Sequence, residues 1–144
     1  MSTTVRMRVL HSFARPRLWQ GLWWLGVVAV FAVCLLPAPD LPQVPQGGDK
    51  VEHLLAYFVL AVGAVLLHAR RVTLWRPALG LWLMGVLIEI LQGTLTTTRS
   101  ADVADALADT IGLALGLSLA CTPLRGCLFA LDQRLFGARS RTRG

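Results

Sequence analysis

The residues of this chain that could do chemistry fall into three short polar patterns, each beside a long apolar run. In chain order the patterns contain Asp49, Lys50, His53 and Tyr57; then Glu89 and Gln92; then Arg99, Asp102, Asp105 and Asp109. A histidine beside carboxylates can transfer protons, and basic side chains can bind phosphate or carboxylate groups. We therefore take His53 and Glu89 as candidate catalytic residues and the other members as candidate ligand-binding residues.

Carboxyl groups outnumber the cations in these patterns. Six carboxyls, counting Glu52, stand against Lys50 and Arg99, so the local charge is −4 with His53 neutral. Carboxylates crowded in this way should not all ionise at neutral pH unless protons are shared, water reaches them or a cation binds. An all-oxygen cluster suits Mg²⁺ or Ca²⁺ better than zinc. A divalent cation is therefore one open alternative, and the sequence alone leaves the metal unknown.

Helical spacing puts the members of each pattern on one face, because residues three or four apart are neighbours on a helix. The three predicted stripes are Lys50, His53 and Tyr57; Gly85, Glu89 and Gln92; and Asp102, Asp105, Asp109, Gly112 and Gly116. Glycines four residues apart let a second helix approach closely in a membrane. We therefore expect tight helix packing directly below the polar groups.

The elements that must position these residues are predicted to be transmembrane helices. The 144-residue chain is 55% hydrophobic and only 15% charged, and its mean hydropathy is +0.60; a soluble chain carries roughly 25% charged residues. Apolar runs cover about residues 19–36, 51–68, 74–92 and 102–122. Even the shorter runs rise about 27 Å, close to the thickness of a bilayer core. We predict an all-α bundle of four transmembrane helices in one membrane domain, residues 19–122.

The basic residues predict how this bundle is oriented. Twelve of the fourteen Lys and Arg residues lie in residues 1–18, around residues 70–76, or after residue 122. Cytoplasmic segments are enriched in Lys and Arg, so both termini are predicted to be cytoplasmic. Because these arginines are separated by apolar runs, we do not interpret the net charge of +6 as a nucleic-acid site.

The C-terminal segment, residues 123–144, is predicted to hold an amphipathic interfacial helix and a basic tail. Leucines at helical spacing from Leu124 to Leu135 would face the membrane, with Asp132 off their stripe. The five tryptophans are assigned to lipid-facing or interfacial positions. In this topology seven of the eight acidic residues lie at or near the extracytoplasmic face. Three helix ends should therefore bring their polar groups together there.

Read in order, these patterns resemble the VanZ-like family of membrane proteins. The resemblance rests on Asp49-Lys50-x-x-His53-x-x-x-Tyr57, on Glu89-x-x-Gln92, and on Arg99-x-x-Asp102-x-x-Asp105-x-x-x-Asp109-x-x-Gly112, within about residues 37–117. Asp109 stands where the family pattern usually has Asn. The resemblance implies a multi-pass protein of the bacterial cytoplasmic membrane, linked through the family's namesake to resistance to the glycopeptide teicoplanin. The family has no settled reaction.

Three functions remain open. In the leading hypothesis an extracytoplasmic site binds or modifies a lipid headgroup, a lipid-linked cell-envelope intermediate or the antibiotic. The second is a membrane hydrolase or transferase that acts on such a substrate. However, the chain contains no G-x-S-x-G, H-E-x-x-H or Walker A motif, so whether it is an enzyme is undecided. The third is a structural partner subunit without activity of its own. The oligomeric state is unknown.

Overall fold

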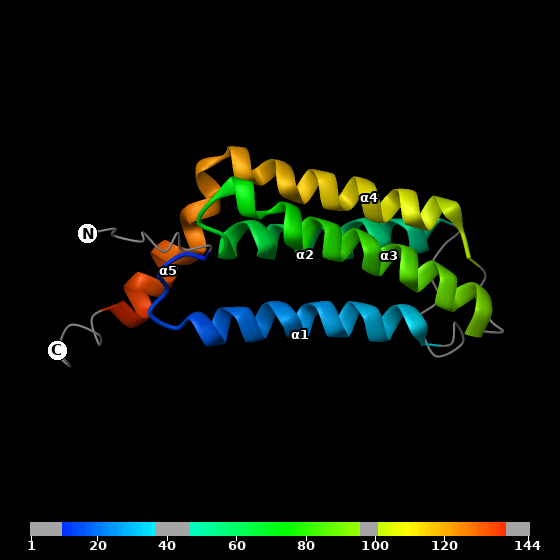
Figure 1. Cartoon of the computed structure of the whole chain (residues 1–144), viewed down its shortest axis with the longest axis horizontal. Helices are drawn as coiled ribbons and strands as arrows, with labels where there is room; N and C mark the ends of the chain where they lie inside the picture. The colour runs from blue at the N-terminus through cyan, green and yellow to red at the C-terminus, as the bar shows by residue number, and fades with distance from the viewer. Residues whose placement is uncertain (1–9, 37–46, 96–100, 138–144) are drawn as a thin grey trace, which may run out of the picture.

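Long helices make up most of this computed structural model, which describes residues 10–36, 47–95 and 101–137. The four longest are α1 (Pro16–Leu35), α2 (Gly48–Leu67), α3 (Trp75–Leu95) and α4 (Val103–Ser118). The shorter ones are η2 (Arg71–Thr73), η3 (Leu119–Cys121), η4 (Pro123–Gly126) and α5 (Cys127–Phe136). The four long helices run side by side along the long axis of the molecule, and α5 lies at one end of them (Figure 1).

Four segments are long and apolar enough to cross a membrane: Pro16–Leu35, Gly48–Leu67, Arg71–Leu95 and Val103–Cys121. The prediction of an all-α fold is confirmed for the described part of the chain, and the four apolar segments indicate a multi-pass membrane protein. The helix ends differ from the predicted ones by a few residues at most. For example, α1 begins at Pro16 rather than near residue 19, because proline fits the first turn of a helix.

The beginning of α1 is held by Asp132, which the sequence analysis placed off the leucine stripe of the C-terminal helix. Asp132, on α5, is completely buried. Its carboxylate accepts hydrogen bonds from the backbone N–H groups of Ala14 and Arg15 and from Trp19 Nε1. The first N–H groups of a helix lack partners within the helix, and a carboxylate there also suits the helix dipole. Asp132 therefore fastens α5 to the start of α1, whereas Leu124, Leu131 and Leu135 remain exposed.

Helices α2 and α4 form the closest pair in the bundle. A Cβ atom added at Gly112 would overlap the carbonyl group of Leu54, and one added at Gly116 would lie 2.6 Å from the carbonyl oxygen of Phe58. The backbones of the two helices are thus in contact at these two glycines, which have no side chain to separate them. The predicted role of this glycine pair is confirmed, and its partner is α2.

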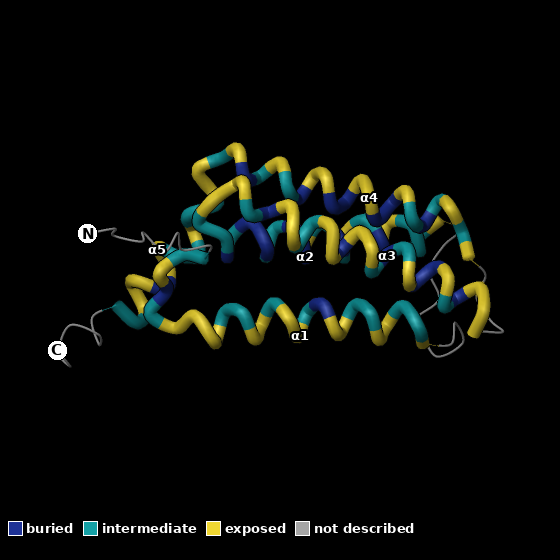
Figure 2. The backbone as a smooth tube through the Cα atoms, viewed as in Figure 1, coloured by how far each residue is buried: buried dark blue, intermediate teal, exposed yellow. Residues whose placement is uncertain are grey.

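Helix α1 lies at the edge of the bundle. Only 6% of its membrane-length window is buried, against 39% for α2 and for α4, and Figure 2 shows α1 mostly exposed or half-buried. Trp23 attaches it to α2, since its Nε1 donates a hydrogen bond to the Leu60 carbonyl at 2.9 Å and its ring packs against Gly63. Trp23 and Trp19 therefore make specific protein contacts, which their assignment to lipid-facing or interfacial positions did not predict.

The glycine contact makes a prediction about stability. Gly112→Ala should destabilise the protein by about 1–3 kcal/mol, the usual cost of inserting a methyl group into a packed core. The measurement is the thermal midpoint of the protein in detergent. Gly21→Ala in α1 is the control, because no atom lies within 4 Å of the added Cβ. Equal midpoints for the two variants would contradict the packing described here.

Candidate functional site

The three polar patterns meet at one end of the bundle, where α2 and α4 begin and α3 ends (Figure 1). This is the end opposite α5. The residues brought together are Asp49, Lys50, His53 and Tyr57 from α2, Glu89 and Gln92 from α3, and Asp102, Asp105 and Asp109 from α4 and its N-cap. Glu52 is exposed on α2. The predicted ligand-binding residue Arg99 lies outside the described residues.

Lys50 organises the outer layer of this cluster. Its Nζ lies 2.9 Å from an oxygen of Asp102, and 3.3 Å from oxygens of both Asp105 and Asp49. The ammonium group holds the pKa of Asp102 below its usual range, and the hydrogen bond from the Ala104 N–H adds to this effect. Asp102 accepts that bond at 2.8 Å as the N-cap of α4. One lysine thus ties the first turn of α2 to the first turn of α4.

A buried pair lies one layer deeper. Nδ1 of His53 is 3.0 Å from Oδ1 of Asp109, and both side chains are almost completely buried. An ionised carboxylate can only accept hydrogen bonds, so Nδ1 carries the proton when Asp109 is charged. Nε2 is then the imidazole nitrogen with a free lone pair. Asp109 therefore orients the ring that the sequence analysis selected as its acid–base candidate.

Two polar atoms beside this pair are buried without a hydrogen-bond partner among the described residues: Asp109 Oδ2 and the Tyr57 hydroxyl. Both adjoin Gly85 on α3. A Cβ atom there would lie 2.8 Å from Asp109 Oδ2 and 3.1 Å from the Tyr57 oxygen. Glycine at this position therefore leaves room next to both groups.

Glu89 and Gln92 have different roles, although they share a face of α3. Oε2 of Glu89 accepts a hydrogen bond of 2.8 Å from the Asp102 backbone N–H, so Glu89 reaches the start of α4. Gln92 is almost completely buried and donates from Nε2 to the Cys34 carbonyl at 2.7 Å, which joins α3 to the end of α1. Glu89 thus belongs to the polar cluster, while this hydrogen bond of Gln92 connects α3 with α1 beside the cluster.

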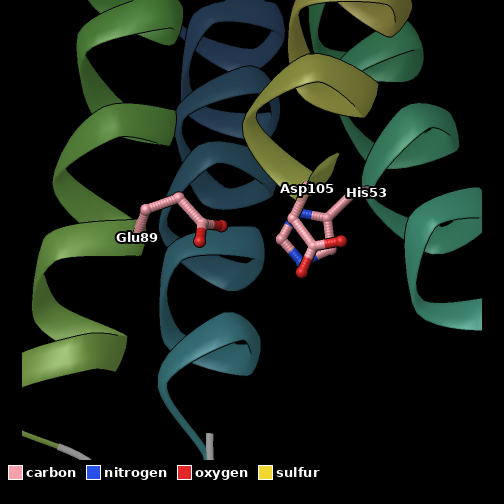
Figure 3. Close-up of side chains that lie close together, drawn as sticks. All are labelled: His53, Glu89 and Asp105. Atoms are coloured by element: carbon pink, nitrogen blue, oxygen red, sulfur yellow. The ribbon is translucent and has the colours of Figure 1, made fainter. Parts of the chain in front are cut away.

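The centre of the cluster is formed by His53, Glu89 and Asp105. Each is buried, and one potential ligand atom from each lies within 4.8 Å of the others. Figure 3 shows the Glu89 carboxylate reaching from α3 toward the adjacent side chains of His53 and Asp105. Three helices therefore each supply one group to this point.

A cavity of about 280 Å³ between α3 and α4 reaches this buried layer. Tyr57, Gly85 and Asp109 line it, together with apolar residues that include Leu107 and Trp82. Leu107 and Trp82 are also exposed on the outside of the bundle. The cavity is therefore largely apolar, and buried polar groups lie along its wall.

A second cavity, of about 560 Å³, lies between α1 and α3 toward the other end of the bundle. Its lining includes Trp23, Trp24, His68 and Arg76. Burial lowers the pKa of His68 and so favours the neutral imidazole. Sequence reasoning missed this cavity, because its existence depends on how far α1 stands away from α3.

Comparison of the chain with protein-family models, curated proteins and solved structures gave no match. The VanZ-like resemblance therefore stays a prediction that rests on the three motifs, and the cluster must be interpreted from its own geometry.

The double role of Asp102 can be separated by mutation. Asn is as good an N-cap as Asp but has no charge for Lys50 to bind, whereas Ala supplies neither function. The thermal midpoint should therefore be highest for the wild type, lower for Asp102→Asn and lowest for Asp102→Ala. The free energies of unfolding of the two variants should differ by about 1 kcal/mol. In a Lys50→Met background the wild-type Asp and the Asn should differ less. If Asn and Ala were equally destabilising, the cap would contribute nothing.

Proposed function

We propose that this chain is a VanZ-like protein of the bacterial cytoplasmic membrane whose polar cluster faces the extracytoplasmic side. There it would bind the polar group of an amphiphile, such as a lipid headgroup or a lipid-linked cell-envelope intermediate. The arginines in the expected cytoplasmic segments support this orientation. The motif resemblance supports the family and a role in the cell envelope that includes protection against teicoplanin.

The observation that carries the proposal is the cavity between α3 and α4, whose wall includes Asp109 and Tyr57. Its apolar residues Leu107 and Trp82 are exposed on the outside of the bundle, where bilayer lipid would surround them. An amphiphile could therefore enter sideways from the bilayer without taking its apolar part through water.

The polar atoms along the cavity indicate what the occupant should offer. Buried polar atoms without partners are costly, and a ligand that supplies hydrogen bonds recovers that cost. Asp109 Oδ2 can accept a hydrogen bond from a hydroxyl or ammonium group, and the Tyr57 hydroxyl can donate or accept one. Lys50, half-exposed above them, can bind phosphate or carboxylate oxygens.

The size of the cavity restricts the occupant further. Its volume of about 280 Å³ lies just below the range of ligand pockets, which occupy about 300–1,000 Å³. One polar group and the adjoining part of a chain fit such a space, whereas a complete glycopeptide antibiotic does not. We therefore favour a membrane lipid or lipid-linked intermediate as the occupant, and any protection against teicoplanin would be indirect.

The hydrolase or transferase alternative draws support from the His53–Asp109 pair. A base whose ring is oriented by a carboxylate is the usual arrangement of acid–base sites, and Glu89 could serve as the second proton carrier. Among the described residues the side-chain partner of His53 is Asp109 rather than a serine, threonine or cysteine, so the nucleophile would be water in a hydrolase or the acceptor substrate in a transferase. Binding without reaction remains the simpler proposal.

Lipid retention tests the proposal. Protein solubilised from bacterial membranes should carry a co-purifying lipid, visible by native mass spectrometry, and Gly85→Ala should lose most of it because the new methyl group fills the space beside Asp109 and Tyr57. Gly21→Ala should retain it. Equal lipid content in the two variants would refute the cavity as the binding site.

The biological consequence is tested with the same two variants. In a glycopeptide-sensitive Gram-positive host, the Gly21→Ala protein should raise the teicoplanin concentration needed for inhibition, and Gly85→Ala should not. If the wild-type chain protects no better than an empty vector, the resistance role fails while the lipid site still stands.

A further inference from the structure

The buried centre of the cluster has the composition of a metal site. His53, Glu89 and Asp105 come from three different helices, and their potential ligand atoms lie within 4.8 Å of one another. Ligands bonded to one ion at about 2.0–2.2 Å are separated from each other by roughly 3–4 Å. A contraction of about an ångström would therefore bring the three groups to bonding distance. Side-chain rotation alone can supply a movement of this size.

Glu89 supplies independent evidence for a ligand at this point. Its Oε2 is occupied by the Asp102 N–H, but Oε1 is buried and has no hydrogen-bond partner in the described part of the chain. The residue Glu89 is more than nine-tenths buried, and its side chain points toward His53 and Asp105 (Figure 3). A buried carboxylate oxygen needs a cation or a hydrogen-bond donor to compensate for its lost hydration.

Asp109 holds the His53 ring through the nitrogen that would not bind the ion. Metal-binding histidines almost always direct their second ring nitrogen to a carboxylate or carbonyl, which fixes the ring and its tautomer. Here Nδ1 of His53 is held by Asp109 at 3.0 Å, which leaves Nε2 for an ion. The Asp109–His53 contact is therefore the support that a histidine ligand requires.

The charges also fit a divalent ion. Glu89, Asp105 and Asp109 carry three negative charges when ionised and Lys50 carries one positive charge, while His53 is neutral as a ligand. One divalent cation therefore makes this group neutral. Lys50 contacts Oδ1 of Asp105 at 3.3 Å, and the other oxygen of this carboxylate can serve the ion. Neutrality matters here because uncompensated charge inside a membrane bundle is costly.

We propose that His53, Glu89 and Asp105 bind one divalent transition-metal ion, with Zn²⁺ the best match. The sequence analysis favoured Mg²⁺ or Ca²⁺ because it treated the cluster as all-oxygen. An imidazole nitrogen in the ligand set instead favours zinc and its neighbours in the transition series. Three protein ligands leave a fourth position on Zn²⁺ for water or an incoming ligand. The inference does not require the lipid proposed above.

Metal binding to purified full-length protein tests this inference. The protein is treated with chelator in detergent and then titrated with Zn²⁺ or Mg²⁺, while bound metal and thermal midpoint are measured. We expect about one tightly bound Zn²⁺ per chain, a higher midpoint, and no comparable effect of Mg²⁺. His53→Ala and Glu89→Gln should bind Zn²⁺ at least about tenfold more weakly, and Asp109→Asn about 10- to 100-fold more weakly.

Two controls identify the site. Glu52→Gln removes an exposed carboxylate next to His53, and His68→Gln removes a histidine at the opposite end of the bundle; both should bind as the wild type does. Absence of stoichiometric Zn²⁺ binding, a preference for Mg²⁺, or equal losses in Glu52→Gln and Glu89→Gln would overturn the proposal. If Glu89→Gln does not fold, Asp109→Asn decides between these outcomes. Loss of the metal site with lipid still retained would leave the proposed function intact.

Discussion

The contact between α2 and α4 is the constraint on which the rest of the structure depends. Because Gly112 and Gly116 bring the two backbones together, His53 can reach Asp109 and Lys50 can reach Asp102 and Asp105. Ionisable groups inside a membrane bundle are costly unless they have partners. The glycines thus do more than pack helices, since they set the distance at which these partners meet. The third helix of the cluster, α3, is joined through Glu89 to the N-cap of α4.

The two ends of the bundle are built differently. At one end Asp132 binds backbone N–H groups and an indole N–H, so its hydrogen bonds serve the attachment of α5 to α1. At the other end Glu89 Oε1, Asp109 Oδ2 and the Tyr57 hydroxyl are buried without partners among the described residues. This contrast between a fully hydrogen-bonded carboxylate at one end and partnerless polar atoms at the other is the reason why we propose a functional site at the second end.

Much of this arrangement could be predicted from the sequence. Hydropathy gave the four spanning segments, and the polar residues at their ends share one membrane level, so their convergence followed from topology. The sequence did not predict which side chains of different helices contact one another. Each contact between helices depends on the rotation of the helices about their axes. Examples are the contacts of His53 with Asp109, of Gln92 with Cys34 and of Trp23 with Leu60. Helical spacing placed Asp132 off the leucine stripe of α5, but it could not show that this face contacts the start of α1.

In the proposed arrangement, four helices cross the membrane and hold the polar cluster at its extracytoplasmic surface. Labelling of single cysteines tests this arrangement in a chain whose three native cysteines are replaced by serine. One variant is Leu95→Cys at the cluster end, and the other is Val72→Cys at the opposite end. The two positions are similarly exposed, at 75% and 73%. In intact cells a membrane-impermeant maleimide should label Leu95→Cys and leave Val72→Cys unlabelled until the cells are broken. Labelling of Val72→Cys but not Leu95→Cys would turn the cluster toward the cytoplasm and contradict the account.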